Sequence, residues 1–198
     1  MKKGVIFFFF TFLLVGCAQI PEPQSISWRT HKQQLENLND WSFTGKLAVI
    51  TPEERHSLNI YWLQSSSNFH ITLTTFLGAT VLDLKKTPSG IQIIDNNGEL
   101  FLGEDADLLI KQLSGLVIPV AALQQWIKGN PNNAAFQLNT NNQVVSLAGV
   151  DSENALWSLN YSDYKSTQGI YLPRKLQLKR LDLRLKFSIS RWKIEQNL

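Results

Sequence analysis

Cysteine is almost absent from this chain of 198 residues, which holds a single one, Cys17. A lone cysteine excludes a disulfide within the chain. Long hydrophobic runs are missing as well. The apolar run from Val5 to Val15 is shorter than the roughly 20 residues that a membrane-spanning helix needs. With 43% hydrophobic and 18% charged residues, the chain still has the composition of one globular domain.

The sequence also lacks the motifs of common catalytic and metal sites. The three histidines have no HExxH or other ligand spacing, and no GxSxG, Walker or GxGxxG motif occurs. The acidic stretch Glu104–Asp107 lacks the rest of a calcium loop and is better explained as charge at a helix start. These absences argue against an enzyme, a metal site and a cofactor. Without Lys2 and Lys3 the net charge of the chain is nearly zero, which argues against a protein that binds nucleic acid.

The N-terminus has the pattern of an export signal. Lys2 and Lys3 precede the apolar run, which ends in Leu14-Val15-Gly16-Cys17. This ending resembles a bacterial lipobox, in which the cysteine is lipidated and becomes the new N-terminus. We therefore expect residues 1–16 to be a signal peptide and Cys17 to carry acyl chains. Ala18 stands where inner-membrane retention signals have Asp, so the resemblance implies an outer-membrane lipoprotein that faces the periplasm.

Two further regions follow the lipobox. Residues 17–27 contain two prolines and no periodicity, which predicts an extended, lipidated tether. Residues 28–198 show no repeat and no long linker, and we expect them to form a single domain. Its first element is a short helix over 28–39 with one narrow apolar stripe.

Most of the domain alternates between apolar and polar residues with a period of two. This pattern predicts half-buried strands joined by tight turns. About ten or eleven such strands would curl rather than stay flat. We therefore predict a mainly β (α+β) fold with a single curled antiparallel sheet. The stretches are WSFTGKLAV, HSLNIYWLQ, FHITLTTFL, ATVLDLKK, GIQIID, ELFLG, AFQLN, QVVSLAGV, ALWSLNYSDY, LPRKLQLKRL and DLRLKFSISRW.

Two helical patterns interrupt the strands. EDADLLIKQLSG begins with acidic residues and ends at Gly115. IPVAALQQWIKGNP has Pro119 at a favourable first helical position and Gly129 at its end. We expect this helix pair to cover one end of the curled sheet as a lid.

Large apolar side chains are frequent on the predicted inner face. Each tryptophan taken alone is explained by a filled core. As a set, these side chains could equally bound a cavity for acyl chains, which need apolar area and few hydrogen bonds. The candidate cavity residues are Trp41, Phe43, Trp62, Ile71, Leu73, Trp126 and Trp157.

The stretch Thr74–Thr80, TTFLGAT, places Phe76 and Leu77 at a predicted hairpin tip, where polar residues are usual. Single exposed apolar residues are ordinary on protein surfaces. Charge is also uneven, since residues 174–198 hold eight basic and two acidic side chains. These could lie near anionic headgroups, or they could be the solvated face of alternating strands.

Taken together, the chain resembles the LolB family of outer-membrane lipoprotein receptors. The stretches that carry the resemblance are LTTFLGATVLDL, IDNNGELF and LSGLVIPVAALQQWIKGNP. It implies an unclosed barrel with helices over its mouth, which accepts acylated lipoproteins from a LolA-like periplasmic carrier and inserts them into the outer membrane. It implies no covalent chemistry, ATP or cofactor, and we expect a monomer.

The resemblance also assigns roles to the hairpin tip. The family's protruding loop falls on TTFLGAT, with the functional apolar residue at Leu77 and the turn glycine at Gly78. The family often has proline where this chain has Phe76. The loss of proline loosens the backbone, and the phenylalanine adds apolar area. We therefore expect Phe76, Leu77 and Gly78 to form a membrane-insertion loop. Two alternatives remain open: a periplasm-facing carrier of lipids without an insertion step, and a structural lipoprotein with a filled core.

Overall fold

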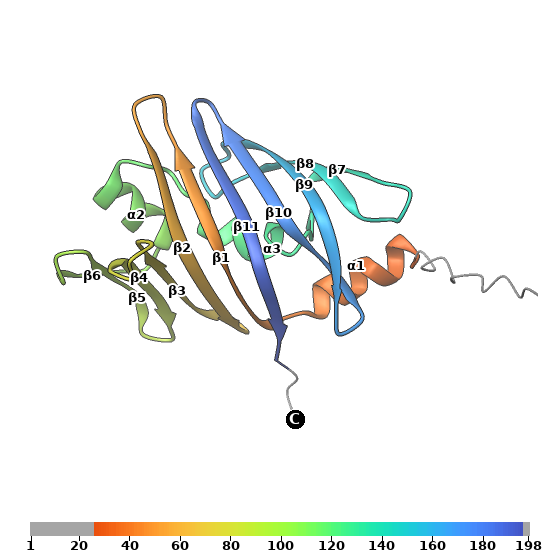
Figure 1. The fold of residues 1–198 in the computed structure, drawn as a ribbon, viewed down its shortest axis with the longest axis horizontal. Coiled ribbons are helices and arrows are strands. Elements are labelled where there is room, and N and C mark those ends of the chain that lie inside the picture. The colour runs from red at the N-terminus through yellow and green to blue at the C-terminus, as the bar shows by residue number, and fades with distance from the viewer. Residues whose placement is uncertain (1–25, 196–198) are drawn as a thin grey trace, which may run out of the picture.

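A computed structural model describes residues 26–195 (Figure 1). This part of the chain forms one sheet of eleven strands in the order β6-β5-β4-β3-β2-β1-β11-β10-β9-β8-β7. The strands are β1 (Asp40–Ile50), β2 (Arg55–Ser65), β3 (Asn68–Thr74), β4 (Thr80–Thr87), β5 (Gly90–Asp95), β6 (Leu100–Gly103), β7 (Ala135–Leu138), β8 (Val144–Val150), β9 (Leu156–Thr167), β10 (Ile170–Arg180) and β11 (Leu183–Ile194). The edge strands β6 and β7 have one neighbour each, so the curled sheet stays open. The prediction of an unclosed antiparallel barrel is confirmed.

The two halves of the sheet join where β1 pairs with β11. At this seam the register shifts between Thr44 and Gly45, and the two backbones come very close. A Cβ atom built on Gly45 would lie 2.4 Å from the Ser188 carbonyl oxygen. Because no side chain fits there, glycine is required for the seam, and the seam carries the pairing that unites the first six strands with the last five.

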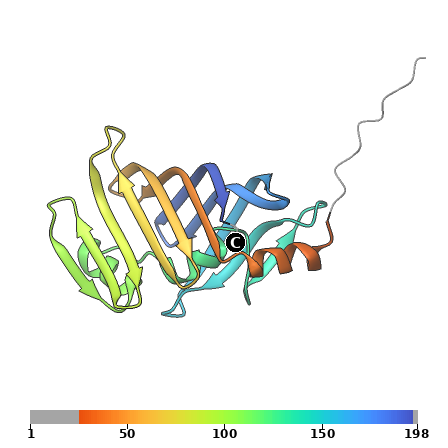
Figure 2. The same cartoon turned by 90° about the horizontal axis from the view of Figure 1, so that it is seen from below.

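Three helices accompany the sheet: α1 (Trp28–Asn37), α2 (Ala106–Ser114) and α3 (Val120–Trp126). Asp105 caps α2 by accepting a hydrogen bond from the Leu108 N–H, and Gly115 ends it in the left-handed conformation, as the sequence predicted. In Figure 1, α3 lies behind the central strands, and Figure 2 shows the sheet arching over it. The helix pair thus occupies the concave side of the sheet.

The concave side holds a single hydrophobic core. At one end of the barrel the rings of Trp41, Phe43, Trp62 and Trp192 pack with centroids 5.0 to 6.0 Å apart. All buried apolar residues of the described region lie between Leu35 and Trp192. Within the described residues, one continuous core thus unites the sheet with all three helices.

One buried cation lies beneath α1. The side chain of Lys128 is 1% exposed, and its Nζ atom donates to the Leu38 carbonyl oxygen at 2.7 Å. Leu38 follows the last residue of α1, so Lys128 satisfies a carbonyl group at the helix end. Burial lowers the pKa of Lys128 from 10.5 to about 8, although the charge of Glu36 opposes this shift.

Because the pKa of Lys128 is lowered in the folded state, we expect the protein to become more stable in mildly alkaline solution. Between the folded pKa of about 8 and the unfolded value of 10.5, the unfolded chain binds more protons. The free energy of unfolding should therefore rise with pH, by about 2 kcal/mol from pH 7 to 9.5. Above pH 10 the trend should reverse, because burial raises the pKa values of Tyr161 and Tyr164.

Urea unfolding followed by tryptophan fluorescence at pH 7 and 9.5 measures this rise. The Lys128→Met variant should lose it, whereas Lys32→Met, at an exposed lysine of α1, should keep it. Equal stability of the unmodified protein at the two pH values would contradict the prediction.

Candidate functional site

An apolar cavity of about 860 Å³ lies between the concave face of the sheet and the helix pair. Its size falls within the range of about 300 to 1,000 Å³ that is usual for ligand sites. The sheet contributes Leu47, Val49, Leu58, Ile60, Leu82, Leu84 and Ile93, among others. The helices and their connection contribute Ile110, Leu113, Leu116, Ile118, Val120 and Leu123. The walls therefore suit long hydrocarbon chains.

The polar residues of the lining, which include His56, Thr75 and Ser114, lie on loops or near the ends of strands and helices. Thr51, Glu53 and Glu54 lie on the β1–β2 hairpin, and Asp95 and Asn96 lie on the β5–β6 turn. These connections and the β3–β4 loop all follow strands that run in the same direction, so they meet at one end of the barrel. This end is the mouth of the cavity.

Three of the seven predicted cavity residues line the cavity: Trp62, Ile71 and Leu73. The other four do not, and the prediction needs correction there. Trp41 and Phe43 share a face of β1 with Leu47 and Val49, but they lie nearer its start, in the aromatic cluster away from the mouth.

Trp126 and Trp157 are core residues for different reasons. Trp126 packs against β8 so closely that a Cβ atom on Gly149 would lie 2.5 Å from its Cζ2 atom. Trp157 is fully buried, and its indole N–H donates to the Asp151 carboxylate at 2.9 Å. Both side chains fix the position of surrounding elements rather than bounding open space.

The sequence did not identify the helical wall of the cavity. Leu116 and Ile118 belong to the short connection between α2 and α3, and neither was among the candidate cavity residues. Their apolar character, directly after the helix-ending Gly115, was the available signal. In a solvated connection such residues would be polar, so the run Leu116–Ile118 marks a connection that faces the cavity.

Asp107 is a second residue whose role the sequence did not reveal. Its buried carboxylate accepts from the Ala121 N–H at 3.2 Å and from the Ser152 hydroxyl at 3.4 Å. Burial raises the pKa of this carboxyl group. Asp107 thus connects α2 with the start of α3 and with the β8–β9 connection, and it holds the helical wall in place.

The β3–β4 loop carries two of the three most exposed large apolar side chains of the described residues, Phe76 (84%) and Leu77 (81%). Its backbone is well bonded. The Gly78 N–H donates to the Thr75 carbonyl oxygen at 3.0 Å, and Thr75 N–H donates to Ala79 at 2.8 Å. Gly78 has a φ of +91°, as the glycine of such a hairpin turn requires. The Thr75 carbonyl also accepts from the Asn59 side chain at 2.9 Å, which ties the base of the loop to β2.

The loop is continuous with the cavity. Leu73 and Thr75, at the base of the loop, belong to the cavity lining. Figure 2 shows the β3–β4 hairpin projecting beyond the neighbouring strands. An apolar ligand could therefore pass from the cavity to the exposed tip along one edge of the mouth.

Two other features are absent from residues 26–195. None of their helices combines the length and the hydropathy needed to cross a membrane. Within the same residues, no group of three or more acidic, histidine or cysteine side chains is placed to hold a metal ion. The fold and the cavity together define an open β-barrel with an apolar interior and a protruding apolar loop.

Comparison with known proteins identifies the family. The model of the family "Outer membrane lipoprotein LolB" matches residues 39–192. The chain is 54% identical over 199 residues to the outer-membrane lipoprotein LolB of Psychromonas ingrahamii, with 99% of this chain and 98% of that one covered. It is 37% identical to LolB of Vibrio vulnificus, over 92% and 93% of the two chains. The chain belongs to the LolB family of outer-membrane lipoproteins.

Solved structures support the fold alone. A LolA superfamily protein from Nitrosomonas europaea superposes with a TM-score of 0.56 at 7% identity, covering 87% of this chain and 96% of that one. A DUF1329 family protein from Desulfovibrio piger has a TM-score of 0.57 at 8% identity, covering 86% and 92%. The open barrel is thus shared with proteins whose sequences have diverged widely. The predicted signal peptide, Cys17 and most of the tether lie outside the described residues.

Proposed function

We propose that this protein is the outer-membrane receptor that accepts acylated lipoproteins from a LolA-like periplasmic carrier and inserts them into the outer membrane. It acts as a monomer, anchored by acyl chains on Cys17 and held off the membrane by residues 17–27. The cavity holds the acyl chains of the cargo, and the loop Phe76–Gly78 contacts the bilayer during release. The observation that carries the proposal is the apolar cavity whose rim includes the base of this exposed loop.

The cavity explains acceptance without a source of chemical energy. Exposing an acyl chain to water costs about 0.8 kcal/mol for each methylene group. A chain that passes directly from one apolar cavity to another avoids this cost, so the net free energy is only the difference between the two sites. Transfer then proceeds towards the site of greater affinity. No bond needs to be made or broken, and no cofactor is required.

The loop explains the second step. Two exposed apolar side chains at a hairpin tip can enter the boundary between headgroups and hydrocarbon, which favours apolar area. The tip would then place the mouth of the cavity at the membrane surface. Cargo could leave for the bilayer without crossing water, since Leu73 and Thr75 connect the cavity with the tip.

A transfer assay tests the proposal. A soluble form comprising residues 18–198, which lacks Cys17 and its lipid, is mixed with a LolA-like carrier loaded with a radiolabelled lipoprotein. The cargo should move to the soluble form, and added liposomes should then take it up. Cargo that stays on the carrier would contradict the receptor function. Cargo that reaches the soluble form but never the liposomes would instead indicate a lipid carrier without an insertion step.

A further inference from the structure

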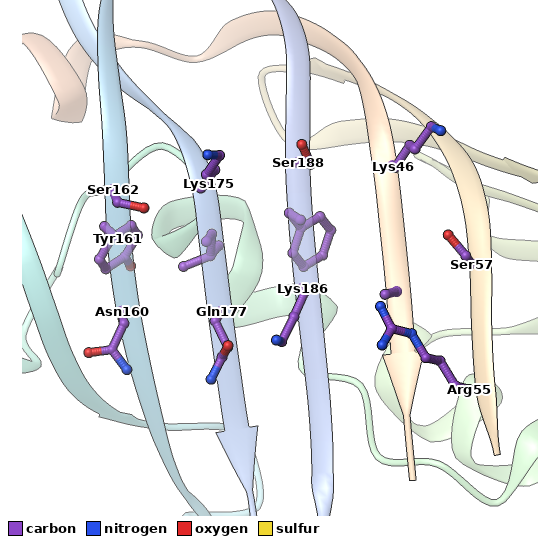
Figure 3. Close-up of a pocket in the computed structure, with 13 residues that line it drawn as sticks. Lys46, Arg55, Ser57, Asn160, Tyr161, Ser162, Lys175, Gln177, Lys186 and Ser188 are labelled. Carbon is purple, nitrogen blue, oxygen red and sulfur yellow. The ribbon is translucent and has the colours of Figure 1, made fainter.

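The convex face of the sheet carries a cluster of cations that the proposed function does not use. Figure 3 shows part of it, where side chains project from β9, β10, β11, β1 and β2, with the helices on the far side. Six basic residues belong to it, and together they are called the basic face: Lys46, Arg55, Lys175, Lys179, Arg184 and Lys186.

Strand register brings these residues together from distant parts of the chain. Lys46 of β1 and Lys175 of β10 both pair with Ser188 of β11, from opposite sides. Lys179 lies directly opposite Arg184. Arg184 and Arg55 likewise flank Ile50 on its two sides. The pairing of β1 with β11 thus places basic residues from both halves of the sheet side by side on the basic face.

The acidic residues nearest to the basic face along the chain, Glu53, Glu54 and Asp182, lie on the hairpins at one end of it. None of the six residues takes part in an ion pair between residues 26 and 195. The positions between them are neutral: Ala48, Ser57, Asn160, Ser162, Gln177 and Ser188. Like charges on facing strands, such as Lys179 and Arg184, destabilise a sheet. The arrangement costs folding stability, and an anionic partner would offset that cost.

The surface is also shaped to receive small anionic groups. A shallow groove of about 530 Å³ runs over it, lined by Lys46, Arg55, Lys175 and Lys186 together with neutral polar side chains. Ala48 and the buried residues Tyr161, Leu176 and Phe187 complete its lining. The aliphatic side chains of this face, Ala48 and Ile50, are only partly exposed, and one exposed aromatic side chain, Tyr61 of β2, lies near Lys46. Stable protein interfaces bury many aromatic and apolar residues at their centre, and this face has few of either. Its chemistry suits phosphate groups at a polar surface better than a protein partner.

The position of the insertion loop indicates where such phosphates are. In Figure 2 the β3–β4 hairpin rises on the side of the sheet away from α3, which is the side to which the basic face projects (Figure 3). A membrane reached by Phe76 and Leu77 therefore lies on the side of the lysines and arginines. We propose that the basic face binds the phosphates of anionic phospholipids, and so orients the domain on the bilayer. This inference goes beyond the proposed function and rests on it only for the presence of a membrane.

Vesicle co-sedimentation of the soluble form tests this inference. Circular dichroism first checks that this form is folded, as the core of the described residues, between Leu35 and Trp192, leads us to expect. At low salt it should bind phosphatidylcholine vesicles that contain phosphatidylglycerol far better than vesicles of phosphatidylcholine alone. Lys175→Gln with Lys186→Gln should weaken binding to the anionic vesicles by about tenfold or more. Binding should also fall as the salt concentration rises, because salt screens exposed charges.

A matched variant separates position from net charge. Lys32→Gln with Lys111→Gln removes two exposed lysines from α1 and α2, and it should bind the anionic vesicles as the unmodified form does. Unchanged binding by the basic-face variant, or an equal loss in the matched variant, would overturn the inference. Normal vesicle binding by the basic-face variant, combined with its failure to accept cargo, would overturn the inference and assign the face to the carrier. If the unmodified soluble form binds anionic vesicles but fails to accept cargo, that result counts against the proposed function alone.

Discussion

Leu77→Glu is expected to take cargo from the carrier and then keep it. Leu77 is 81% exposed, makes no part of the cavity lining and does not belong to the core. Replacing it should leave folding and acceptance nearly unchanged. A carboxylate resists entry into hydrocarbon, at a cost of a few kcal/mol or more, so the tip should no longer insert. Release of labelled lipoprotein into liposomes should fall by about tenfold or more, since 1.4 kcal/mol corresponds to a factor of ten.

The chain offers a close control for this variant. Leu102, on the edge strand β6, is 65% exposed and belongs neither to the cavity lining nor to the basic face. Leu102→Glu adds the same charge at an exposed leucine outside the β3–β4 loop. It should release cargo normally. Equal defects in the two variants would show that added negative charge, rather than the position of Leu77, controls release.

The strand pattern allowed most of the fold to be predicted from the sequence. β11 illustrates why: Leu185, Phe187 and Ile189 are buried, and Lys186 and Ser188 between them are exposed. A period of two is the direct consequence of strand geometry with one side buried. The helix pair was equally visible, because Asp105 and Gly115 are residues whose chemistry suits the two ends of a helix. Local chemistry and local geometry coincide at these positions.

The cavity could be predicted only in part, because periodicity identifies a face and not a position along it. Trp41 and Leu47 lie on the same side of β1, yet one packs in the aromatic cluster and the other lines the cavity. The difference depends on where α3 and the α2–α3 connection lie against the sheet. That placement arises from long-range packing, such as Trp126 against Gly149, which leaves no local signal.

The full extent of the basic face could not be predicted from the sequence, for a related reason. The excess of positive charge after residue 174 was evident, and alternation placed it on the solvent side of β10 and β11. The sequence did not reveal that Lys46 and Arg55 join the same field. They do so because β1 pairs with β11, a contact between strands more than a hundred residues apart in the chain. Strand order, rather than strand pattern, creates the cluster.

Leu73→Glu should produce the opposite defect to Leu77→Glu, since it blocks acceptance. Leu73 is only partly buried and lines the cavity near its mouth, so a carboxylate there can reach water while the cavity is empty. An acyl chain that entered would strip this water, and the charged group resists desolvation. The fraction of cargo taken from a loaded carrier should fall by about tenfold or more.

Thr74→Glu places the same carboxylate on the next residue of β3, whose side chain points to the opposite face of the sheet. It should accept cargo normally, with circular dichroism confirming that both variants are folded. If Leu73→Glu accepted cargo as well as Thr74→Glu does, the cavity would not be the acyl site. If Leu73→Glu fails at acceptance and Leu77→Glu at release, the two steps are physically separate. Cavity and loop would then act in sequence, only a few residues apart on one hairpin.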